Sequence, residues 1–307
     1  MKSLLNEKGE PFISVVEYDG YLFPNLLAKV DVPKYLAARN ELGFDGDEIC
    51  IATYPKTGTH WAYEVCRMLK AGNTDFMNEL VPILDYTPME ALKVVKATNR
   101  IYTSHMYPRH IPKQLIEKRC KLILVYRNPK DTAVSYFDFS KKVRAFDTGD
   151  MCFSEFLRHY ICGNVVCGSW AKWVEEWKTF KEENPDYPLL EIFYEDMKMN
   201  LRECVQKISE FLGLNSIPEL VKEIARKCEF KVMADHKNKN IPKDIGAVTD
   251  FKDTHVFYGK GEMGNWKNRF TVADNEAFDK AMETILPQLG LNFTYEQSLP
   301  NKYHHKL

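Results

Sequence analysis

The sequence predicts an α/β fold in which a parallel β-sheet is flanked by helices on both faces. Short runs rich in β-branched residues alternate with helical stretches, two of the runs are almost wholly apolar, and no linker or repeat divides the 307 residues. Alternating strands and helices favour a parallel sheet, because parallel strands need crossovers that cover both faces. A chain of this length is near the size at which one core stops growing, so we expect residues 1–307 to form one domain.

A strand, a turn and a helix follow one another twice. Residues 48–54 form an apolar run typical of a buried strand, and residues 59–69 place apolar side chains at helical spacing. Residues 121–126 form a second apolar strand, and Pro129 suits the first turn of a helix that runs through Phe139. The other predicted elements are strands at 101–104 and 189–194 and helices at about 169–181, 201–212, 218–228 and 273–286. The polar stretch 231–259 has little periodicity, so we expect a mobile loop that covers the site.

Composition and charge narrow the class of protein. The 42 basic and 43 acidic side chains give a net charge of -1, which gives no reason to expect nucleic acid or membrane as a partner. The first residues lack the apolar core of a signal peptide, and no apolar stretch is long enough to span a bilayer, so we expect a cytoplasmic protein. The cysteines show neither a C-x-x-C pair nor zinc-type spacing, which indicates reduced thiols and no metal site.

The turn after the first strand reads YPKTGTHW, from residue 54 to residue 61. Gly58 lets the backbone approach an anion, the helix N-terminus offers unpaired N–H groups, and Lys56 adds positive charge. An ordinary strand-to-helix turn with Thr59 as N-cap would also explain the glycine and the threonine. In ATP- and GTP-binding loops the lysine follows the second glycine, whereas Lys56 precedes the single glycine of this turn. We therefore expect a P-loop-like sheet whose loop binds a phosphate-like group without metal.

The end of the second apolar strand is cationic. Arg127 follows it directly, and Lys130 comes three residues later. An enzyme that uses ATP or GTP needs an acidic residue near such a strand end to hold Mg²⁺. A metal-dependent kinase is therefore disfavoured, although ATP consumption with Mg²⁺ would revive it.

Three long segments resemble the cytosolic sulfotransferase family, in family order and spacing. They are residues 54–61, RNPKDTAVSYF at 127–137 and KGEMGNWKNRFT at 260–271, and the resemblance covers nearly the whole chain. It implies transfer of a sulfuryl group from the cosubstrate 3′-phosphoadenosine-5′-phosphosulfate (PAPS) to a hydroxyl of a small, mainly hydrophobic acceptor. The spent cosubstrate would be 3′,5′-diphosphoadenosine.

The resemblance also implies which residues bind PAPS. In the family the first loop binds the 5′-phosphosulfate, which corresponds here to Lys56, Thr57, Gly58, Thr59, His60 and Trp61. The other two motifs hold the 3′-phosphate, which corresponds to Arg127, Ser135, Lys260 and Gly261. The adenine site would comprise the aromatic residues Trp61, Tyr194 and Phe230, together with Cys228. Arg127 could instead be a surface ion pair, Ser135 a solvated helix residue, and the aromatics plain core.

His105 is the general base that the resemblance implies, and Lys56 is the group that stabilises the leaving phosphate. Imidazole has a pKa close to working pH, so it suits the removal of a proton from the acceptor hydroxyl. A lone histidine at a strand end is more often structural than catalytic, so the assignment depends on the motif around His105. Five other histidines lie in the phosphate loop, the 231–259 stretch or the C-terminal tail: His60, His236, His255, His304 and His305.

Three positions depart from the family pattern. Thr103 stands where relatives often have a lysine, two residues before His105, and Gly259 stands where an arginine often precedes Lys-Gly. Cys228 takes the place of a threonine near the adenine. Cys228 and Gly259 predict weaker binding of PAPS than in relatives that have both family residues, and the missing lysine at Thr103 predicts weaker stabilisation of the transition state unless another group supplies it. The missing lysine also keeps an alternative function open, that of a non-catalytic or weakly active protein that binds PAPS and a ligand.

Residues 267–276 fit the pattern K-x-x-x-T-V-x-x-x-E, which in the family forms a homodimer contact. The resemblance thus implies a homodimer, although a loop followed by a helix start with acidic residues would explain the same letters. Family pockets for the acceptor are apolar, and here we expect Phe23, Tyr107, Phe139 and Phe146, all of which could equally be core. Phenols, steroids and aliphatic alcohols all stay open as acceptors.

Overall fold

The computed structural model describes residues 1–77, 80–240, 259 and 261–296. Its centre is a four-stranded sheet with the order β5-β4-β6-β7, in which every neighbouring pair is parallel. The strands are β4 (Ile49–Thr53), β5 (Ile101–Ser104), β6 (Lys121–Tyr126) and β7 (Leu189–Phe193). The predicted parallel sheet is confirmed. The sequence did not predict a second, antiparallel sheet formed by β1 (Lys2–Leu5), β2 (Pro11–Tyr18) and β3 (Tyr21–Pro24).

Helices account for most of the remaining described residues. The α-helices are α1 (Val32–Ala38), α2 (Thr59–Ala71), α3 (Met89–Ala97), α4 (Lys113–Glu117), α5 (Pro129–Ser140), α6 (Phe153–Cys162), α7 (Trp170–Glu183), α8 (Tyr194–Met199), α9 (Leu201–Leu212), α10 (Pro218–Lys227), α11 (Phe230–Lys239), α12 (Val272–Met282) and α13 (Ile285–Leu289). Short 3₁₀ helices are η1 (Asn25–Leu27), η2 (Arg39–Leu42), η3 (Pro108–His110), η4 (Arg144–Phe146) and η6 (Asn265–Asn268). No helix in these described ranges is long and apolar enough to cross a membrane.

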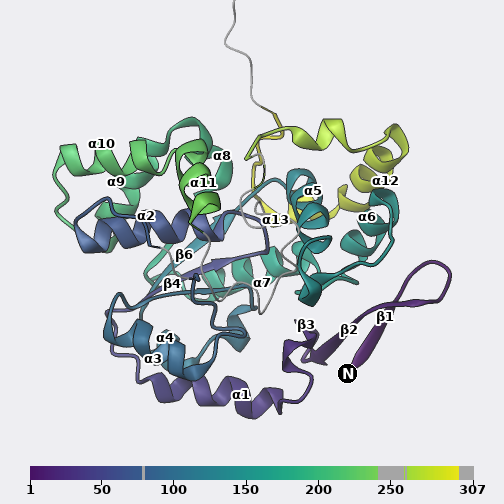
Figure 1. Cartoon of the computed structure of the whole chain (residues 1–307), viewed down its shortest axis with the longest axis horizontal. Helices are drawn as coiled ribbons and strands as arrows, with labels where there is room; N and C mark the ends of the chain where they lie inside the picture. Colours follow the sequence, from purple (N-terminus) through teal and green to yellow (C-terminus); the bar gives the residue numbers. More distant parts are fainter. Residues whose placement is uncertain (78–79, 241–258, 260, 297–307) are drawn as a thin grey trace, which may run out of the picture.

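The two faces of the sheet carry separate hydrophobic clusters, because successive strand residues point to opposite faces. Ile51 and Val125 pack with α2, α9 and α10 on one face. Ala52 and Leu124 pack on the other face, in a cluster that includes Trp173 of α7. In Figure 1, α2 and α8 to α11 gather on one side of the molecule, and α5, α6 and α12 on the other. Helices therefore cover both faces, as the apolar runs predicted.

Two predicted elements differ from the structure. The stretch 231–259 was predicted to be a loop, but residues 231–239 belong to helix α11 (Phe230–Lys239), while residues 241–258 lie outside the described residues. This helix is hard to see in the sequence because only Met233 and Ala234 are buried within it. The single helix predicted at 273–286 is divided into α12 and α13. All eight cysteines are free thiols, and six of them are buried.

The sheet topology determines where a ligand can lie. The chain leaves β4 toward β5 on one side and leaves β6 toward β7 on the other, although β4 and β6 are neighbours. In open parallel sheets this switch of direction opens a crevice at the carboxyl ends of the two strands. The loop after β4 holds Lys56, and the loop after β6 begins with Arg127, so the two predicted cation-bearing loops meet there.

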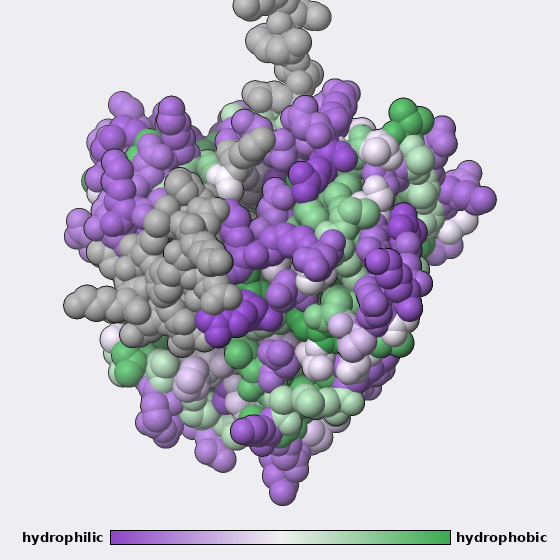
Figure 2. Space-filling view, turned by 45° about the vertical axis from the view of Figure 1, so that its right-hand side comes forward, coloured by the Kyte–Doolittle hydropathy of each residue, from purple (hydrophilic) through white to green (hydrophobic). Residues whose placement is uncertain are grey.

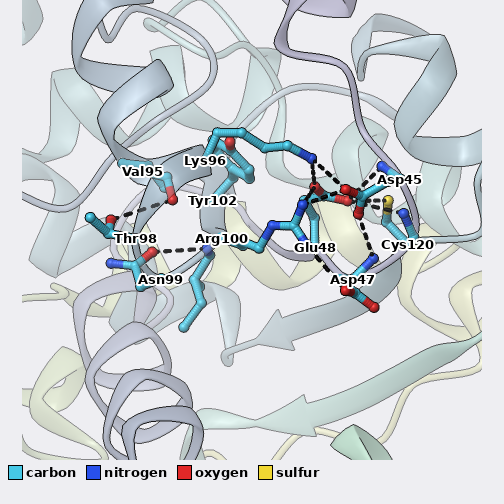
Figure 3. Close-up of polar contacts among 12 residues, drawn as sticks. Asp45, Asp47, Glu48, Val95, Lys96, Thr98, Asn99, Arg100, Tyr102 and Cys120 are labelled. Atoms are coloured by element: carbon cyan, nitrogen blue, oxygen red, sulfur yellow. Dashed lines mark hydrogen bonds and ion pairs between the residues drawn. The ribbon is translucent and has the colours of Figure 1, made fainter.

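A cluster of charged side chains around Glu48 lies at the amino ends of β4 and β6, away from the crevice (Figure 3). The Glu48 side chain has no exposed surface and accepts hydrogen bonds from the main-chain N–H groups of Asp45 and Gly46, both at 3.1 Å. It also pairs with Lys96 and lies 3.6 Å from Arg100. Burial alone would raise the pKa of Glu48, but its hydrogen bonds, above all from Lys96, hold it below the ordinary value.

We expect Glu48→Gln to lower the free energy of unfolding by about 1.5–3 kcal/mol at neutral pH, because it removes hydrogen bonds to a charged group. The folded pKa is depressed, so the contribution of Glu48 is complete above its unfolded pKa and is lost as the pH falls through the folded value. Urea unfolding of both proteins at neutral and at acidic pH checks this. A difference that stays constant or grows on acidification would contradict it.

Candidate active site

A cavity of about 730 Å³ opens at the carboxyl ends of β4 and β6. Its lining includes residues from both loops predicted to bind an anion, from α5, and from the segments that precede β5 and follow α11. Among the predicted site residues, those that line it are Lys56, Gly58, Thr59, His60, Trp61, His105, Arg127, Ser135, Tyr194, Phe230 and Gly261. Figure 2 shows one face of the molecule, on which small apolar patches lie among mostly hydrophilic side chains.

The loop between β4 and α2 is built to expose its backbone. Lys56 and Gly58 both adopt positive φ angles, of 70° and 116°. Thr57 is buried and donates its hydroxyl to the carbonyl groups of Tyr54 (2.8 Å) and Val125 (3.1 Å), so it ties the loop to β6. No side chain caps the N-terminus of α2, where Gly58 is the N-cap residue. Its first N–H groups and the helix dipole therefore face the cavity as a site for an anion.

Lys56 lies part-buried at the centre of this loop. Its Nζ sits 4.3 Å from the centre of the Phe139 ring. Burial lowers the pKa of Lys56 to about 7, and the charges of Arg127 and Lys142 act in the same direction. A cation destabilised in this way would gain from a bound anion, because an opposite charge restores the preference for the charged form.

Arg127 joins the two loops across the cavity. It donates from Nη1 to the Lys56 carbonyl (3.0 Å) and from Nη2 to the Glu262 carbonyl (3.4 Å). Its guanidinium lies over the Tyr194 ring, 4.2 Å from the centre. Its buried Nε has no hydrogen-bond partner among the described residues. Ser135 of α5 also lines the cavity, so two of the four predicted 3′-phosphate ligands, Arg127 and Ser135, face the same space.

Three aromatic rings line the cavity near Gly261. Trp61 meets Tyr194 edge-on at 5.3 Å and Phe230 at 5.6 Å. The Phe230 ring lies directly on Gly261, where an added Cβ would come within 2.1 Å of it. Cys228 is close by but does not line the cavity: its carbonyl accepts the Trp61 indole N–H (2.6 Å), and its thiol faces Met68. Lys260 lies outside the described residues.

Asp131 holds the loop that carries Gly261, and sequence reasoning missed it. Its carboxylate accepts the main-chain N–H groups of Gly264 (2.8 Å) and Trp266 (2.9 Å) from 133 and 135 residues further along the chain. Asn128, the N-cap residue of α5, donates its side-chain amide to the same carboxylate. The only signal in the sequence is the acidic residue in the first turn of α5, which has an ordinary explanation in the helix dipole.

His105 follows β5 and is 6% exposed at the cavity. Its Nδ1 lies 2.8 Å from the Thr53 carbonyl oxygen and 3.1 Å from the Thr53 hydroxyl. Burial lowers the pKa of His105 and the charge of Asp85 opposes that effect. The nearby Thr103 is buried and donates its hydroxyl to the Pro82 carbonyl (2.8 Å), so the position where relatives often carry a lysine has no cation here.

The four aromatic residues expected at the acceptor end fall into two groups. Phe139 and Phe146 line the cavity. Phe23 and Tyr107 are buried in the core, 0% and 1% exposed, and do not line it. Ile83 and Tyr86, from the segment before β5, line the cavity instead, and no motif in the sequence predicts them there. No group of three or more His, Cys, Asp or Glu side chains in the described part of the chain could hold a metal ion.

One cavity of this α/β protein thus brings together a helix N-terminus, a lysine, an arginine and three aromatic rings, a combination that suits an aromatic, multiply charged anion. The chain matches the family model described as the sulfotransferase domain over residues 46–292. It therefore belongs to the sulfotransferase family, and the resemblance to its cytosolic members is confirmed by curated relatives. The chain is a sulfotransferase enzyme.

Among the similar proteins is sulfotransferase 1E1 of Bos taurus, 35% identical over 258 residues, which cover 80% of this chain and 86% of that protein. The 3-beta-hydroxysteroid sulfotransferase of Cavia porcellus is 34% identical over 77% of this chain and 82% of its own length. The solved structure of mouse sulfotransferase SULT7A1 complexed with PAP superposes with a TM-score of 0.70 at 27% identity. It covers 88% of this chain and 94% of the mouse chain.

Proposed function

We propose that this enzyme transfers the sulfuryl group of PAPS to a hydroxyl of a small, mainly hydrophobic acceptor, with His105 as general base. The observation that carries the proposal is the environment of the His105 ring. The Thr53 carbonyl oxygen can only accept a hydrogen bond, so Nδ1 must donate to it. In the neutral ring Nε2 then keeps its lone pair and is the atom that can take a proton.

The reaction moves one proton and one sulfuryl group. The acceptor hydroxyl gives its proton to His105 Nε2 as its oxygen attacks sulfur. The bond between sulfur and the bridging phosphate oxygen breaks, and 3′,5′-diphosphoadenosine leaves with negative charge on that oxygen. Lys56 is proposed to stabilise this charge, together with the N-terminus of α2, because donors placed where charge develops usually supply the largest part of catalysis.

The nucleotide is proposed to lie along the cavity between the two loops. The 5′-phosphosulfate would bind the segment from Lys56 to Trp61, and the 3′-phosphate would bind Arg127, Ser135 and the Lys260–Gly261 segment. The unpartnered Nε of Arg127 supports the second assignment, since a buried donor without a partner is costly unless a ligand satisfies it. The rings of Trp61, Tyr194 and Phe230 would contact the adenine. The relative crystallised with PAP supports this choice of cosubstrate.

The acceptor is proposed to lie against Phe139, Phe146, Ile83 and Tyr86, which line the same cavity as His105. This apolar wall supports a phenol, a steroid or an aliphatic alcohol rather than a sugar. A relative named as a 3-beta-hydroxysteroid sulfotransferase supports the steroid class.

Incubation with PAPS and a panel of phenols, steroids and alcohols tests the proposal. We expect sulfated product and 3′,5′-diphosphoadenosine in equal amounts for at least one acceptor. The alternative is a protein that binds PAPS and a ligand but turns over slowly, and the missing cation at Thr103 favours it. Tight binding of both molecules without product would support that alternative and contradict the proposal.

Gly259→Arg is expected to strengthen binding of 3′,5′-diphosphoadenosine by at least about tenfold, because one charge-assisted hydrogen bond contributes roughly 1.5–3 kcal/mol. Gly259 lines the cavity, and a Cβ added there would meet no atom of the described residues within 4 Å. Calorimetric titration measures the change, with Gly259→Gln as the neutral control. Equal affinities for the arginine and glutamine variants would contradict the expectation.

We also propose that residues 267–276 form a homodimer contact. Val272, the first residue of α12, is 77% exposed, which is unusual for a large apolar side chain. The hydroxyl and main chain of Thr271 form a capping box with Asp274, which fixes the start of the helix beside it. A rigid, exposed apolar residue suits a small interface.

We expect Val272→Glu to convert a dimer into a monomer while the rate of sulfuryl transfer stays within about twofold, because surface substitutions away from the site perturb little. Light scattering at high concentration measures the mass. Val94→Glu on α3, where the side chain is 61% exposed, is the matched control and should stay dimeric. A wild-type protein that is monomeric at every concentration would overturn the proposal.

A further inference from the structure

The segment from Pro82 to Thr87, which precedes α3, is bonded to β5 along its length. Thr103 donates its main-chain N–H (2.9 Å) and its hydroxyl (2.8 Å) to the Pro82 carbonyl, and Leu84 donates its N–H to the Thr103 carbonyl (2.8 Å). On the other side the buried Arg39 donates to the carbonyl groups of Leu84 (3.2 Å) and Thr87 (2.8 Å). The segment is therefore fixed from two sides.

Asp85 lies in the middle of this segment and is 1% exposed. Its carboxylate accepts the hydroxyl of Ser104 (2.7 Å) and the main-chain N–H of His105, at 3.0 Å from Oδ2 and 3.2 Å from Oδ1. It forms no ion pair with any residue that the structure describes. Burying a carboxylate without a paired cation costs free energy, and a purely structural contact could have used a neutral side chain.

His105 is consequently held at two points from two different segments. Asp85 fixes its main chain, and Thr53 of β4 orients its ring through Nδ1. The carboxylate does not touch the ring, so it cannot take the proton that Nε2 receives. It can act on the ring by holding its position and by its charge.

We propose that Asp85 is a positioning residue for sulfuryl transfer: it fixes the main chain of His105, and its negative charge stabilises the imidazolium that forms during the reaction. This inference rests on the proposed role of His105 as base. The proton passes from the acceptor hydroxyl to Nε2, and Asp85 stays ionised throughout. The same segment places Ile83 and Tyr86 on the cavity wall, so the acceptor surface and the support of the base are one rigid piece.

Other charged groups act on this pair. Burial is the largest effect and lowers the pKa of His105, Asp85 raises it, and Lys56 lowers it. Burial raises the pKa of Asp85, and His105 lowers it. The charge of Asp85 also acts on one buried cation and on several neutral hydroxyl and thiol groups: Arg39, Tyr21, Tyr35, Tyr86, Cys50 and Cys167.

The central variant is Asp85→Asn, which removes the charge and keeps the shape. Outer-layer groups that orient the ligands of metal sites typically account for about 10–100-fold in activity, and we expect a comparable effect for a group that orients a base, so kcat should fall by at least about tenfold. The base must be neutral to act, and loss of the nearby negative charge lowers the pKa of His105. The acid limb of the kcat profile should therefore move to lower pH, while the KM for PAPS changes little.

Two controls separate this role from a structural one. Asp85→Glu keeps the charge and should keep the pH of the acid limb, even if kcat falls. Glu48→Gln neutralises a buried carboxylate at the other end of β4 and should leave the acid limb unchanged. An acid limb that stays in place in Asp85→Asn, or one that moves equally in Glu48→Gln, would overturn the proposal.

An NMR titration of the His105 ring in the protein without substrates gives a readout that does not depend on turnover. We expect the pKa of His105 to be lower in Asp85→Asn than in the wild type, and unchanged in Asp85→Glu. If the wild type does not transfer sulfuryl groups, the proposed function is wrong. The NMR titration would still test whether Asp85 raises the pKa of His105. If Asp85→Asn does not fold, a His105 pKa in Asp85→Glu that falls below the wild-type value overturns the proposal, and an unchanged value supports it.

Discussion

Replacement of His105 by alanine is expected to reduce kcat by at least about 100-fold, the lower end of what a positioned general base contributes. The variant loses the Nε2 lone pair, and water in the cavity is a far weaker base at neutral pH. Affinity for 3′,5′-diphosphoadenosine should stay close to that of the wild type, because the two cation-bearing loops are untouched. Steady-state kinetics with a phenol acceptor and calorimetric titration of the nucleotide measure the two quantities.

His159→Ala is the matched control for this experiment. His159 lies on α6, contacts Phe12 and does not line the cavity. Its removal should leave kcat within about twofold of the wild type. A His105→Ala enzyme that keeps more than a tenth of the wild-type kcat would show that another group removes the proton.

Lys56→Met is expected to lower kcat by about 100-fold or more, since removal of one donor to a developing negative charge typically costs about 2.7–4 kcal/mol. Methionine keeps most of the length of the side chain and its contact with Phe139, so the loss reports on the charge. Lys141→Met is the matched control. Lys141 also lines the cavity, but its ammonium group donates a hydrogen bond to the Gly149 carbonyl. Equal losses in the two variants would contradict the assignment.

The lowered pKa of Lys56 predicts that the protein takes up a proton when the nucleotide binds. In the protein without nucleotide, burial lowers the pKa of Lys56 to about 7, so most of the population is neutral above that pH. A bound phosphosulfate raises the pKa again, because the anion favours the charged form. Calorimetry at mildly alkaline pH, in buffers with different ionisation enthalpies, should show net proton uptake that is absent in Lys56→Met. Proton release on binding would contradict the expected sign.

The parts of the fold that the sequence predicts well are those determined by local patterns. The strands β4 and β6 are apolar runs that end in a glycine-containing turn or a proline, and α2 shows its buried face directly. Helix α11 and the antiparallel sheet of β1 to β3 were not predicted. Only two residues of α11 are buried. The hairpin of β2 and β3 did have a local signal that was overlooked: Asp19-Gly20, both at positive φ, joins two largely apolar runs, as in a two-residue hairpin turn.

The residues of the candidate site also divide into those that a local sequence pattern predicts and those that it does not. The loop around Lys56 and the cationic strand end at Arg127 carry their chemistry in consecutive residues, and the structure brings both to one cavity. Asp85 and Asp131 act on partners that are 20 and more than 130 residues away along the chain, so no local pattern could reveal them. Phe23 and Tyr107 were expected at the cavity but are core, because residue type alone does not distinguish a pocket wall from packed interior.

Calorimetric titration with 3′,5′-diphosphoadenosine tests most directly whether the cavity at the ends of β4 and β6 binds the nucleotide of a sulfotransferase. We expect saturable binding at one site per chain, with a Kd in the micromolar range or tighter, and at least about tenfold weaker binding in Arg127→Gln. The expected weakening comes from the loss of the guanidinium charge beside the 3′-phosphate. No measurable binding to the wild-type protein, or equal binding to Arg127→Gln, would contradict the account.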